Sequence, residues 1–162
     1  MNILWAGWRE KFIRSKRPKG CIFCQKIKSK QDKKNLVIFR GKHCFVVLNL
    51  YPYNNGHLMV VPYSHKKDLE ELDAEEFCEL FLLVKKMISV LKKTHSPDGF
   101  NIGINLGRAG GAGVDKHLHI HIVPRWIGDV NFMSSVSKTK VISEMLERTY
   151  KMVKRCVDKE KF

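Results

Sequence analysis

Three histidines alternate with aliphatic residues at His117, His119 and His121, in the run His-Leu-His-Ile-His-Ile-Val over 117–123. Side chains at positions i, i+2 and i+4 share one face of a β-strand. The spacing therefore predicts a strand with a row of imidazoles on one side. The aliphatic residues between the histidines would pack into a core on the other side.

A glycine-rich stretch, Asn-Leu-Gly-Arg-Ala-Gly-Gly-Ala-Gly-Val-Asp-Lys over 105–116, lies directly before the histidines. Glycine lets the main chain approach a phosphate closely, and successive N–H groups can then bind its oxygens. Such a loop beside a row of imidazoles predicts chemistry on a phosphorus atom.

The residues alone leave three interpretations of the histidine row. The histidines can be satisfied polar residues of a half-buried strand, although three on one face are hard to satisfy without a functional reason. One can be a nucleophile toward phosphorus, provided that its other ring nitrogen is held as a donor. The row can also bind zinc, as in hydrolases that have three histidine ligands and use a metal-bound hydroxide.

The remaining periodicity predicts an α+β domain with an antiparallel sheet. Runs of β-branched and aromatic residues predict strands at 36–39, 45–48, 57–62 and 100–105, besides 117–123. Apolar residues at intervals of three and four, from Phe77 and Phe81 onwards, predict one long helix over 73–94, which Asp73 and Glu76 begin with a capping box. A last helix is expected over 134–157, with Met145, Leu146, Tyr150 and Val153 on its buried side.

The length of 162 residues favours one compact domain. We expect an N-terminal arm over 1–20, a main domain over 21–133 and a C-terminal helix over 134–162 packed on the same domain. The lysine-rich segment 28–34 should be an exposed loop. No apolar run approaches the ~18 residues of a membrane span, and the first ten residues lack a signal-peptide core, so a cytoplasmic protein without membrane partners is expected.

Thirty basic and 16 acidic residues give a net charge of +14. Such a field attracts polyanions, including nucleic acid and nucleotides. Much of the charge lies in two segments that look peripheral, 11–34 and 138–161, where solvated lysine is the simpler explanation. A basic module that binds nucleic acid is the non-enzymatic alternative, but no basic strand interleaved with aromatic residues supports it.

Two of the five cysteines, Cys21 and Cys24, have an informative spacing. The odd total argues against a disulfide framework, and Cys44 and Cys78 fall in a predicted strand and helix, where they should be buried. A Cys-x-x-Cys pair in a reduced compartment is half of a zinc site or a redox pair. Two unligated thiols remain the simpler alternative.

The string over 117–123 resembles the signature of the histidine triad (HIT) superfamily of nucleotide hydrolases and transferases, in which His-x-His-x-His precedes two apolar residues. Gly-His-Leu-Met-Val-Val-Pro over 56–62, with Asn49 eight residues before His57, resembles the upstream strand pair of that family. The resemblance extends over roughly residues 21–130.

The run from 105 to 133 and the segment Leu-Trp-Ala-Gly-Trp-Arg over 4–9 are similar to the bacterial branch that includes diadenosine tetraphosphate phosphorylases. The resemblance implies a five-stranded antiparallel sheet with one long helix and a C-terminal helix, assembled as a homodimer. It implies cleavage of dinucleoside polyphosphates through a covalent nucleotidyl-histidine, with phosphate or water as the acceptor. A nucleoside phosphoramidase of the same superfamily is the enzymatic alternative.

The resemblance also implies residue roles. His119 would be the nucleophile, the carbonyl of His117 would orient it, and His121 would contact phosphate. The implied nucleotide contacts are Asn49, His57, Asn105, Gly111, Gly113, Val114 and His121. Many family members have Ser or Thr three residues before the triad, so Val114 removes a hydroxyl contact. The basic side chains of Arg108 and Arg125 are further candidates for phosphate clamps.

The family resemblance gives the Cys-x-x-Cys pair a set of partners. In zinc-bearing members the other ligands are the first triad histidine and a histidine after the upstream strand. Those positions are His117 and His65, which with Cys21 and Cys24 would complete a closed tetrahedral zinc site. The expected cofactor is therefore a structural zinc ion, with no organic cofactor.

Overall fold

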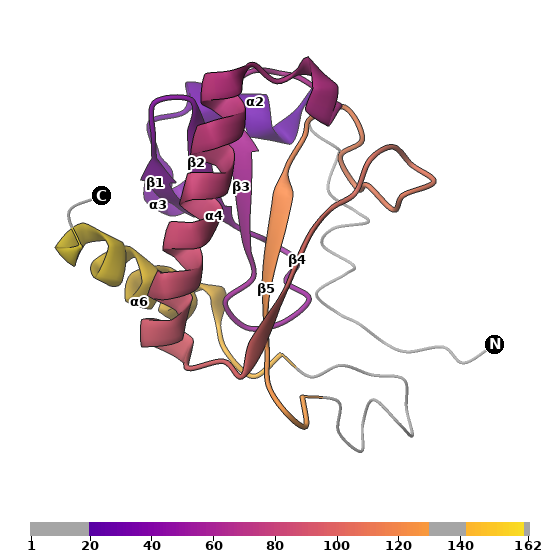
Figure 1. The fold of residues 1–162 in the computed structure, drawn as a ribbon. Coiled ribbons are helices and arrows are strands. Elements are labelled where there is room, and N and C mark those ends of the chain that lie inside the picture. Colours follow the sequence, from indigo (N-terminus) through magenta and orange to yellow (C-terminus); the bar gives the residue numbers. More distant parts are fainter. Residues whose placement is uncertain (1–19, 130–141, 161–162) are drawn as a thin grey trace.

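A five-stranded antiparallel sheet forms the centre of the protein, in a computed structural model that describes residues 20–129 and 142–160 (Figure 1). The order across the sheet is β1-β2-β3-β5-β4. The strands are β1 Val37–Arg40, β2 Cys44–Leu48, β3 Leu58–Pro62, β4 Gly99–Ile104 and β5 Ile120–Arg125. The predicted α+β class and the five-stranded antiparallel sheet are confirmed.

The long helix α4, Ala74–His95, lies across one face of the sheet (Figure 1). It begins with the predicted capping box, because the Asp73 carboxylate accepts from the Glu76 N–H at 2.8 Å and the Glu76 carboxylate accepts from the Asp73 N–H. The helix α6, Leu146–Lys159, packs against α4 and β1. Among the described residues, no helix combines the length and the apolarity needed to cross a bilayer.

The two faces of the sheet contact two separate hydrophobic clusters. On β2, Cys44, Val46 and Leu48 join the cluster beneath α4, whereas Phe45 and Val47 join a smaller one on the opposite face. The smaller cluster also contains Phe23 of the helix α2, Ile22–Lys28. The aliphatic residues between the triad histidines, Leu118, Ile120 and Ile122, belong to the cluster beneath α4, so the predicted alternation of faces holds.

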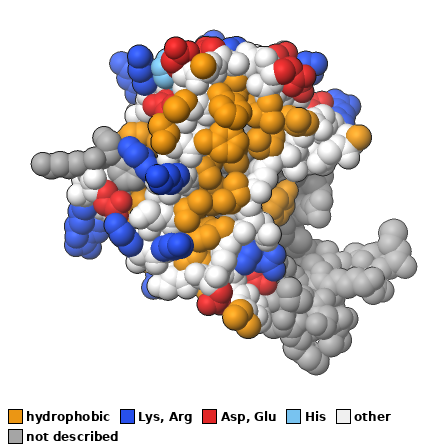
Figure 2. Space-filling view, viewed as in Figure 1, with side chains coloured by type: hydrophobic (Ala, Val, Ile, Leu, Met, Phe, Trp, Pro, Cys, Tyr) orange, Lys and Arg blue, Asp and Glu red, His pale blue; other side chains and the backbone are white. Residues whose placement is uncertain are grey.

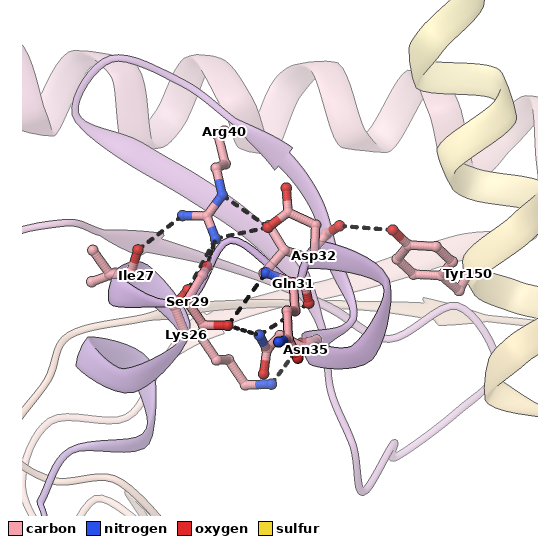
Figure 3. A network of polar contacts seen from close by, with 9 residues as sticks. Lys26, Ile27, Ser29, Gln31, Asp32, Asn35, Arg40 and Tyr150 are labelled. Atoms are coloured by element: carbon pink, nitrogen blue, oxygen red, sulfur yellow. Dashed lines mark hydrogen bonds and ion pairs between the residues drawn. The ribbon is translucent and has the colours of Figure 1, made fainter.

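An arginine on β1 connects α2 to the sheet (Figure 3). The Arg40 guanidinium donates to the carbonyls of Lys26 and Ser29 at 2.9 and 2.8 Å, and to the carboxylate of Asp32 at 2.8 Å. These bonds satisfy carbonyls near the end of α2 that have no partner within the helix. The position of α2 matters because this helix carries Cys24 and Phe23.

Most element ends differ from the sequence predictions by one residue, and three differences are larger. A short helix α3, Asp32–Asn35, interrupts the segment expected to be a loop, and the Arg40–Asp32 pair holds it. The strand expected from His117 begins at Ile120, because the preceding main chain turns away to pair Leu118 N–H with the Lys66 carbonyl at 2.7 Å. The last helix begins at Leu146, after a non-helical stretch at 142–145, and the predicted part over 134–141 lies outside the described residues.

Several burial predictions were wrong. Phe77, Phe81 and Met145 are 47%, 43% and 76% exposed, although the helical pattern assigned them to buried faces. Cys78 on α4 is exposed as well, whereas Cys44 is fully buried as predicted. The apolar stripe of α4 is wider than the surface that the sheet and α6 cover, so its margin remains in solvent.

Candidate active site

A cavity of about 780 Å³ opens on the face of the sheet opposite α4. Main-chain and side-chain groups from α2, the turn before β3, the glycine-rich loop and the histidine segment surround it. The lining residues are Gly20, Cys21, Ile22, Phe23, Asn49, Tyr51, Tyr53, Met59, His65, Asn105, Gly113, Val114, Asp115, Lys116, His119 and His121. Segments that are distant in sequence therefore meet around the second and third histidines of the triad.

His119 is held with one ring nitrogen free. Its Nδ1 lies 2.9 Å from the carbonyl oxygen of His117. A carbonyl oxygen only accepts, so Nδ1 carries the hydrogen and Nε2 keeps its lone pair. Burial lowers the pKa of His119 below its ordinary value, and the ring is only 4% exposed. A neutral imidazole with a fixed tautomer at the edge of a cavity has the form that a nucleophile requires.

A chain of hydrogen bonds assigns the tautomers of two further histidines. The Tyr53 N–H donates to His57 Nδ1 at 3.0 Å, so the hydrogen of a neutral His57 is on Nε2. That nitrogen lies 3.0 Å from His121 Nδ1 and donates to it. His121 therefore carries its own hydrogen on Nε2 and offers a donor beside the nucleophile. The sequence did not reveal Tyr53, whose ring also stacks on His57 with a 4.9 Å centroid separation.

The pair of His57 and His121 makes stability depend on pH. Burial and neighbouring histidines lower the pKa of His57 from 6.5 to about 3 and that of His121 from 6.5 to about 4. Between these values and 6.5 the unfolded chain binds more protons than the folded one, so the free energy of unfolding falls as the pH drops through this window.

We expect the melting temperature to decrease between about pH 7 and about pH 4.5, and to decrease less steeply in a His121→Gln variant, which lacks one of the two titrating groups. Thermal unfolding followed by circular dichroism at several pH values measures both slopes. Identical slopes in the two proteins would contradict the assignment.

The four residues proposed as metal ligands are brought together. One ligand atom from each of Cys21, Cys24, His65 and His117 lies within 4.8 Å of all the others. His117 Nδ1 is 3.2 Å from Cys21 Sγ and 3.6 Å from Cys24 Sγ, and His65 Nδ1 is 3.2 Å from Cys24 Sγ. Ligands bound tetrahedrally to zinc at 2.0–2.3 Å lie roughly 3.3–3.8 Å apart, and these three separations are close to that range. Two sulfur and two imidazole donors are also a usual set for a structural zinc ion.

The tautomer of His117 suits metal binding as well. Its Nε2 lies 2.9 Å from the carbonyl oxygen of Pro62 and therefore donates to it. The lone pair of Nδ1 then faces the two sulfur atoms. A histidine that donates its far N–H to a carbonyl is the usual arrangement around a metal ligand.

The other predicted site residues are distributed as follows. Asn49, Asn105, Gly113 and Val114 line the cavity, and Val114 also packs against the smaller hydrophobic cluster. Gly111 is not part of the described cavity wall. It has a φ of +86° and its carbonyl accepts from the Asn105 side chain at 3.4 Å, so it shapes the turn of the loop.

The two arginine candidates are held by carboxylates. Arg108 donates to Asp115 at 2.8 Å, and Arg125 forms two bonds to Asp129 at 2.7 and 2.8 Å. Neither lines the cavity. Arg108 instead bridges the start and the end of the glycine-rich loop.

Two further histidines, His43 and His95, lie in segments of turn-like composition, for which exposure would be expected, but neither is exposed. His43 is half-buried in the turn between β1 and β2, where the Glu79 carboxylate accepts from the N–H groups of Lys42, His43 and Cys44. The side chain of His95 is only 3% exposed and lies 3.2 Å from the Glu144 carboxylate. Both lie beside carboxylates that are distant in sequence, which turn composition does not reveal.

Several known proteins are similar to this chain in sequence. The HIT domain family matches residues 30–126. The chain is 48% identical over 122 residues to an AP-4-A phosphorylase of Mycobacterium tuberculosis, a match that covers 75% of this chain and 63% of the relative. It is 37% identical over 89 residues to a bis(5'-nucleosyl)-tetraphosphatase [asymmetrical] of Schizosaccharomyces pombe, covering 55% and 48% of the two chains.

Solved structures show the same fold. A hypothetical histidine triad nucleotide-binding protein from Sulfolobus tokodaii superposes with a TM-score of 0.71 at 27% identity, over 87% of this chain and 94% of the other. A zinc-bound histidine triad family protein from Mycobacterium smegmatis superposes with a TM-score of 0.70 at 24% identity, over 86% and 94% of the two chains.

Proposed function

The chain belongs to the HIT family, and we propose that it cleaves dinucleoside polyphosphates such as diadenosine tetraphosphate through a nucleotidyl group carried on His119. The observation that carries the proposal is the 2.9 Å bond between His119 Nδ1 and the His117 carbonyl, which leaves Nε2 free to attack phosphorus. The similarity to an AP-4-A phosphorylase supports the substrate class.

The proposed reaction consists of two in-line displacements. His119 Nε2 attacks the α-phosphorus, a P–N bond forms, and the P–O bond to the leaving nucleotide breaks. The Nε2–H of His121 is positioned to stabilise charge on the phosphoryl oxygens or on the leaving oxygen. The acceptor, phosphate or water, then attacks the same phosphorus from the opposite side, and the electron pair of the P–N bond returns to His119.

The nucleotide contacts are assigned to the cavity wall. We propose that Asn49 binds the ribose and that Asn105 and the main chain at Gly113 and Val114 contact the phosphates, because all four line the cavity that holds His119. The N–H groups of the glycine-rich loop can approach the phosphates without a side chain in the way.

Product analysis tests the function and identifies the acceptor. With diadenosine tetraphosphate and inorganic phosphate, a phosphorylase yields ADP and ATP. Without phosphate, a hydrolase yields AMP and ATP. Chromatography of both mixtures separates these outcomes, and a parallel reaction with adenosine phosphoramidate tests the phosphoramidase alternative. Absence of turnover of the tetraphosphate in both mixtures would contradict the proposed substrate.

We also propose that Cys21, Cys24, His65 and His117 hold a structural zinc ion. Burial and the neighbouring Cys21 raise the pKa of the Cys24 thiol, and a divalent cation between the sulfurs would stabilise both as thiolates. Zinc would supply a tetrahedral crosslink between α2 and the histidine segment. The ring of His117 would then be fixed, and with it the main chain whose carbonyl orients His119.

One face of the protein exposes hydrophobic side chains that are suited to the homodimer implied by the resemblance. β4 is an edge strand of the sheet, and Ile102 on it is 45% exposed on the α4 side. Phe77, Phe81 and Leu82 of α4 are 47%, 43% and 50% exposed. Figure 2 shows hydrophobic side chains gathered across this face of the molecule. We propose that a second copy of the chain covers it, because monomers rarely expose an apolar patch of this kind.

A charge placed in this surface should separate the subunits. We expect Phe81→Glu to elute as a monomer where the wild type elutes as a dimer, because the dimer would bury an unpaired carboxylate. Light scattering after gel filtration measures the mass. Ile127→Glu, at a residue 91% exposed beyond the end of β5, is the control and should remain dimeric. A monomeric wild type would contradict the proposal.

A further inference from the structure

The cavity that contains His119 has little positive charge of its own. His121 accepts a hydrogen bond at Nδ1 from His57 and is therefore a neutral ring, and His119 is almost completely buried. Among the described residues that line the cavity, Lys116 is the one lysine or arginine. The two charges of the proposed zinc ion would be balanced by the thiolates of Cys21 and Cys24, so the metal would add no net charge to the cavity.

The nearby acidic and basic groups are already paired. Asp115, the neighbour of Lys116 in the cavity wall, accepts from Arg108 at 2.8 Å, and the charges of Arg108 and, to a smaller extent, Lys116 lower its pKa. Lys66, near the metal ligands, forms an ion pair with Glu76 at 2.7 Å. Lys116 is exposed, and within the described part of the chain its amine forms no hydrogen bond or ion pair. It therefore remains available to a ligand.

The proposed substrate needs a positive charge such as that of the Lys116 ammonium group. A dinucleoside tetraphosphate carries about four negative charges, and only the α-phosphoryl group can lie at His119. The remaining phosphates must extend from there toward solvent. Lys116 is three residues before His119, at the end of the glycine-rich loop, and lines the same cavity. A phosphoramidate, by contrast, has a single phosphoryl group and an uncharged leaving group.

Building on the proposed function, we propose that Lys116 is a specificity-determining residue, whose ammonium group binds the polyphosphate of the leaving nucleotide and favours dinucleoside polyphosphates over nucleoside phosphoramidates. The role is one of binding rather than of bond making. An ammonium group at the rim of a site acts mainly on association and on its salt dependence.

The test compares two substrates in three variants. Lys116→Met removes the charge, Lys116→Arg keeps it, and Lys151→Met removes the same charge from the exposed side of α6. For Lys116→Met, we expect kcat/KM on diadenosine tetraphosphate to fall about fivefold more than kcat/KM on adenosine phosphoramidate, mostly through KM. Lys116→Arg should restore the wild-type ratio, and Lys151→Met should not change it.

Salt and binding measurements separate this proposal from the proposed function. Raising the ionic strength should lower tetraphosphate kcat/KM less in Lys116→Met than in the wild type. Calorimetry with a methylene-bridged, uncleavable tetraphosphate should show about fivefold weaker binding by Lys116→Met. An equal loss on both substrates, or unchanged affinity for the analogue, would overturn the role of Lys116. A wild type that binds the analogue but cleaves neither substrate would instead overturn the proposed function.

Discussion

Replacing His119 with Ala should lower kcat for diadenosine tetraphosphate by about 10³-fold or more, because the variant has no group that can accept the nucleotidyl moiety. The fold should persist, since the ring makes one hydrogen bond to its own segment and packs against Phe23 at a centroid separation of 5.1 Å. Affinity for the uncleavable analogue should change little, because the loop and Lys116 are unaltered.

The matched control is His43→Gln, which replaces a histidine outside the cavity. Its rate should stay within about twofold of the wild type, as expected for a substitution away from the site. Mass spectrometry of acid-free quenched wild-type mixtures should detect a nucleotidyl adduct on the peptide that contains 117–123, and none in His119→Ala. A His119→Ala enzyme with the wild-type rate would show that another group is the nucleophile.

Removing a zinc ligand should have the second large effect. Cys24→Ser replaces one of two thiolates, so we expect its zinc content to fall well below one ion per chain. When free zinc is present at about 1,000 times its Kd, its binding contributes roughly 4 kcal/mol to the free energy of unfolding. Loss of the ion should therefore lower Tm by ~10 °C for a domain of this size. Elemental analysis and thermal unfolding measure the two quantities directly.

Cys78→Ser, at an exposed cysteine on α4, is the control and should keep both the zinc and the Tm. Treatment of the wild type with a strong chelator should reproduce the Tm of Cys24→Ser. Because the proposed ion holds His117, and the His117 carbonyl orients His119, the metal-free protein should also lose activity. Wild-type protein produced with excess zinc and found to contain none would exclude the metal site.

Short-range patterns predicted most of the framework correctly. The alternation from His117 to Ile122 assigned histidines and aliphatic residues to opposite faces, and the structure keeps that assignment although β5 itself begins at Ile120. The spacing between Asp73 and Glu76 correctly marked the beginning of α4. Both features depend on main-chain geometry within a few residues, which the sequence specifies directly.

The sequence predictions that were wrong depend on contacts between distant parts of the chain. Phe77 and Phe81 fit the helical period but remain exposed, because what covers a helix face depends on neighbours that the period does not describe. His95 has a turn composition but is buried by Glu144, 49 positions later. Tyr53 belongs to no recognised motif, and Lys116 is only the last residue of the glycine-rich stretch, so their place in the cavity wall is what draws attention to them.

By itself, the sequence determined which residues are candidates for the chemistry and which face of the chain the triad histidines occupy, because strand alternation and helix capping are local. Only the tertiary structure decided which nitrogen is protonated in His117, His57 and His121, since the Pro62 carbonyl assigns the hydrogen of His117, the Tyr53 N–H that of His57, and His57 in turn that of His121. It also decided whether Cys21 and Cys24, at the start of α2, meet histidines up to 96 positions away. Such contacts depend on how the sheet, α2 and the loops pack together.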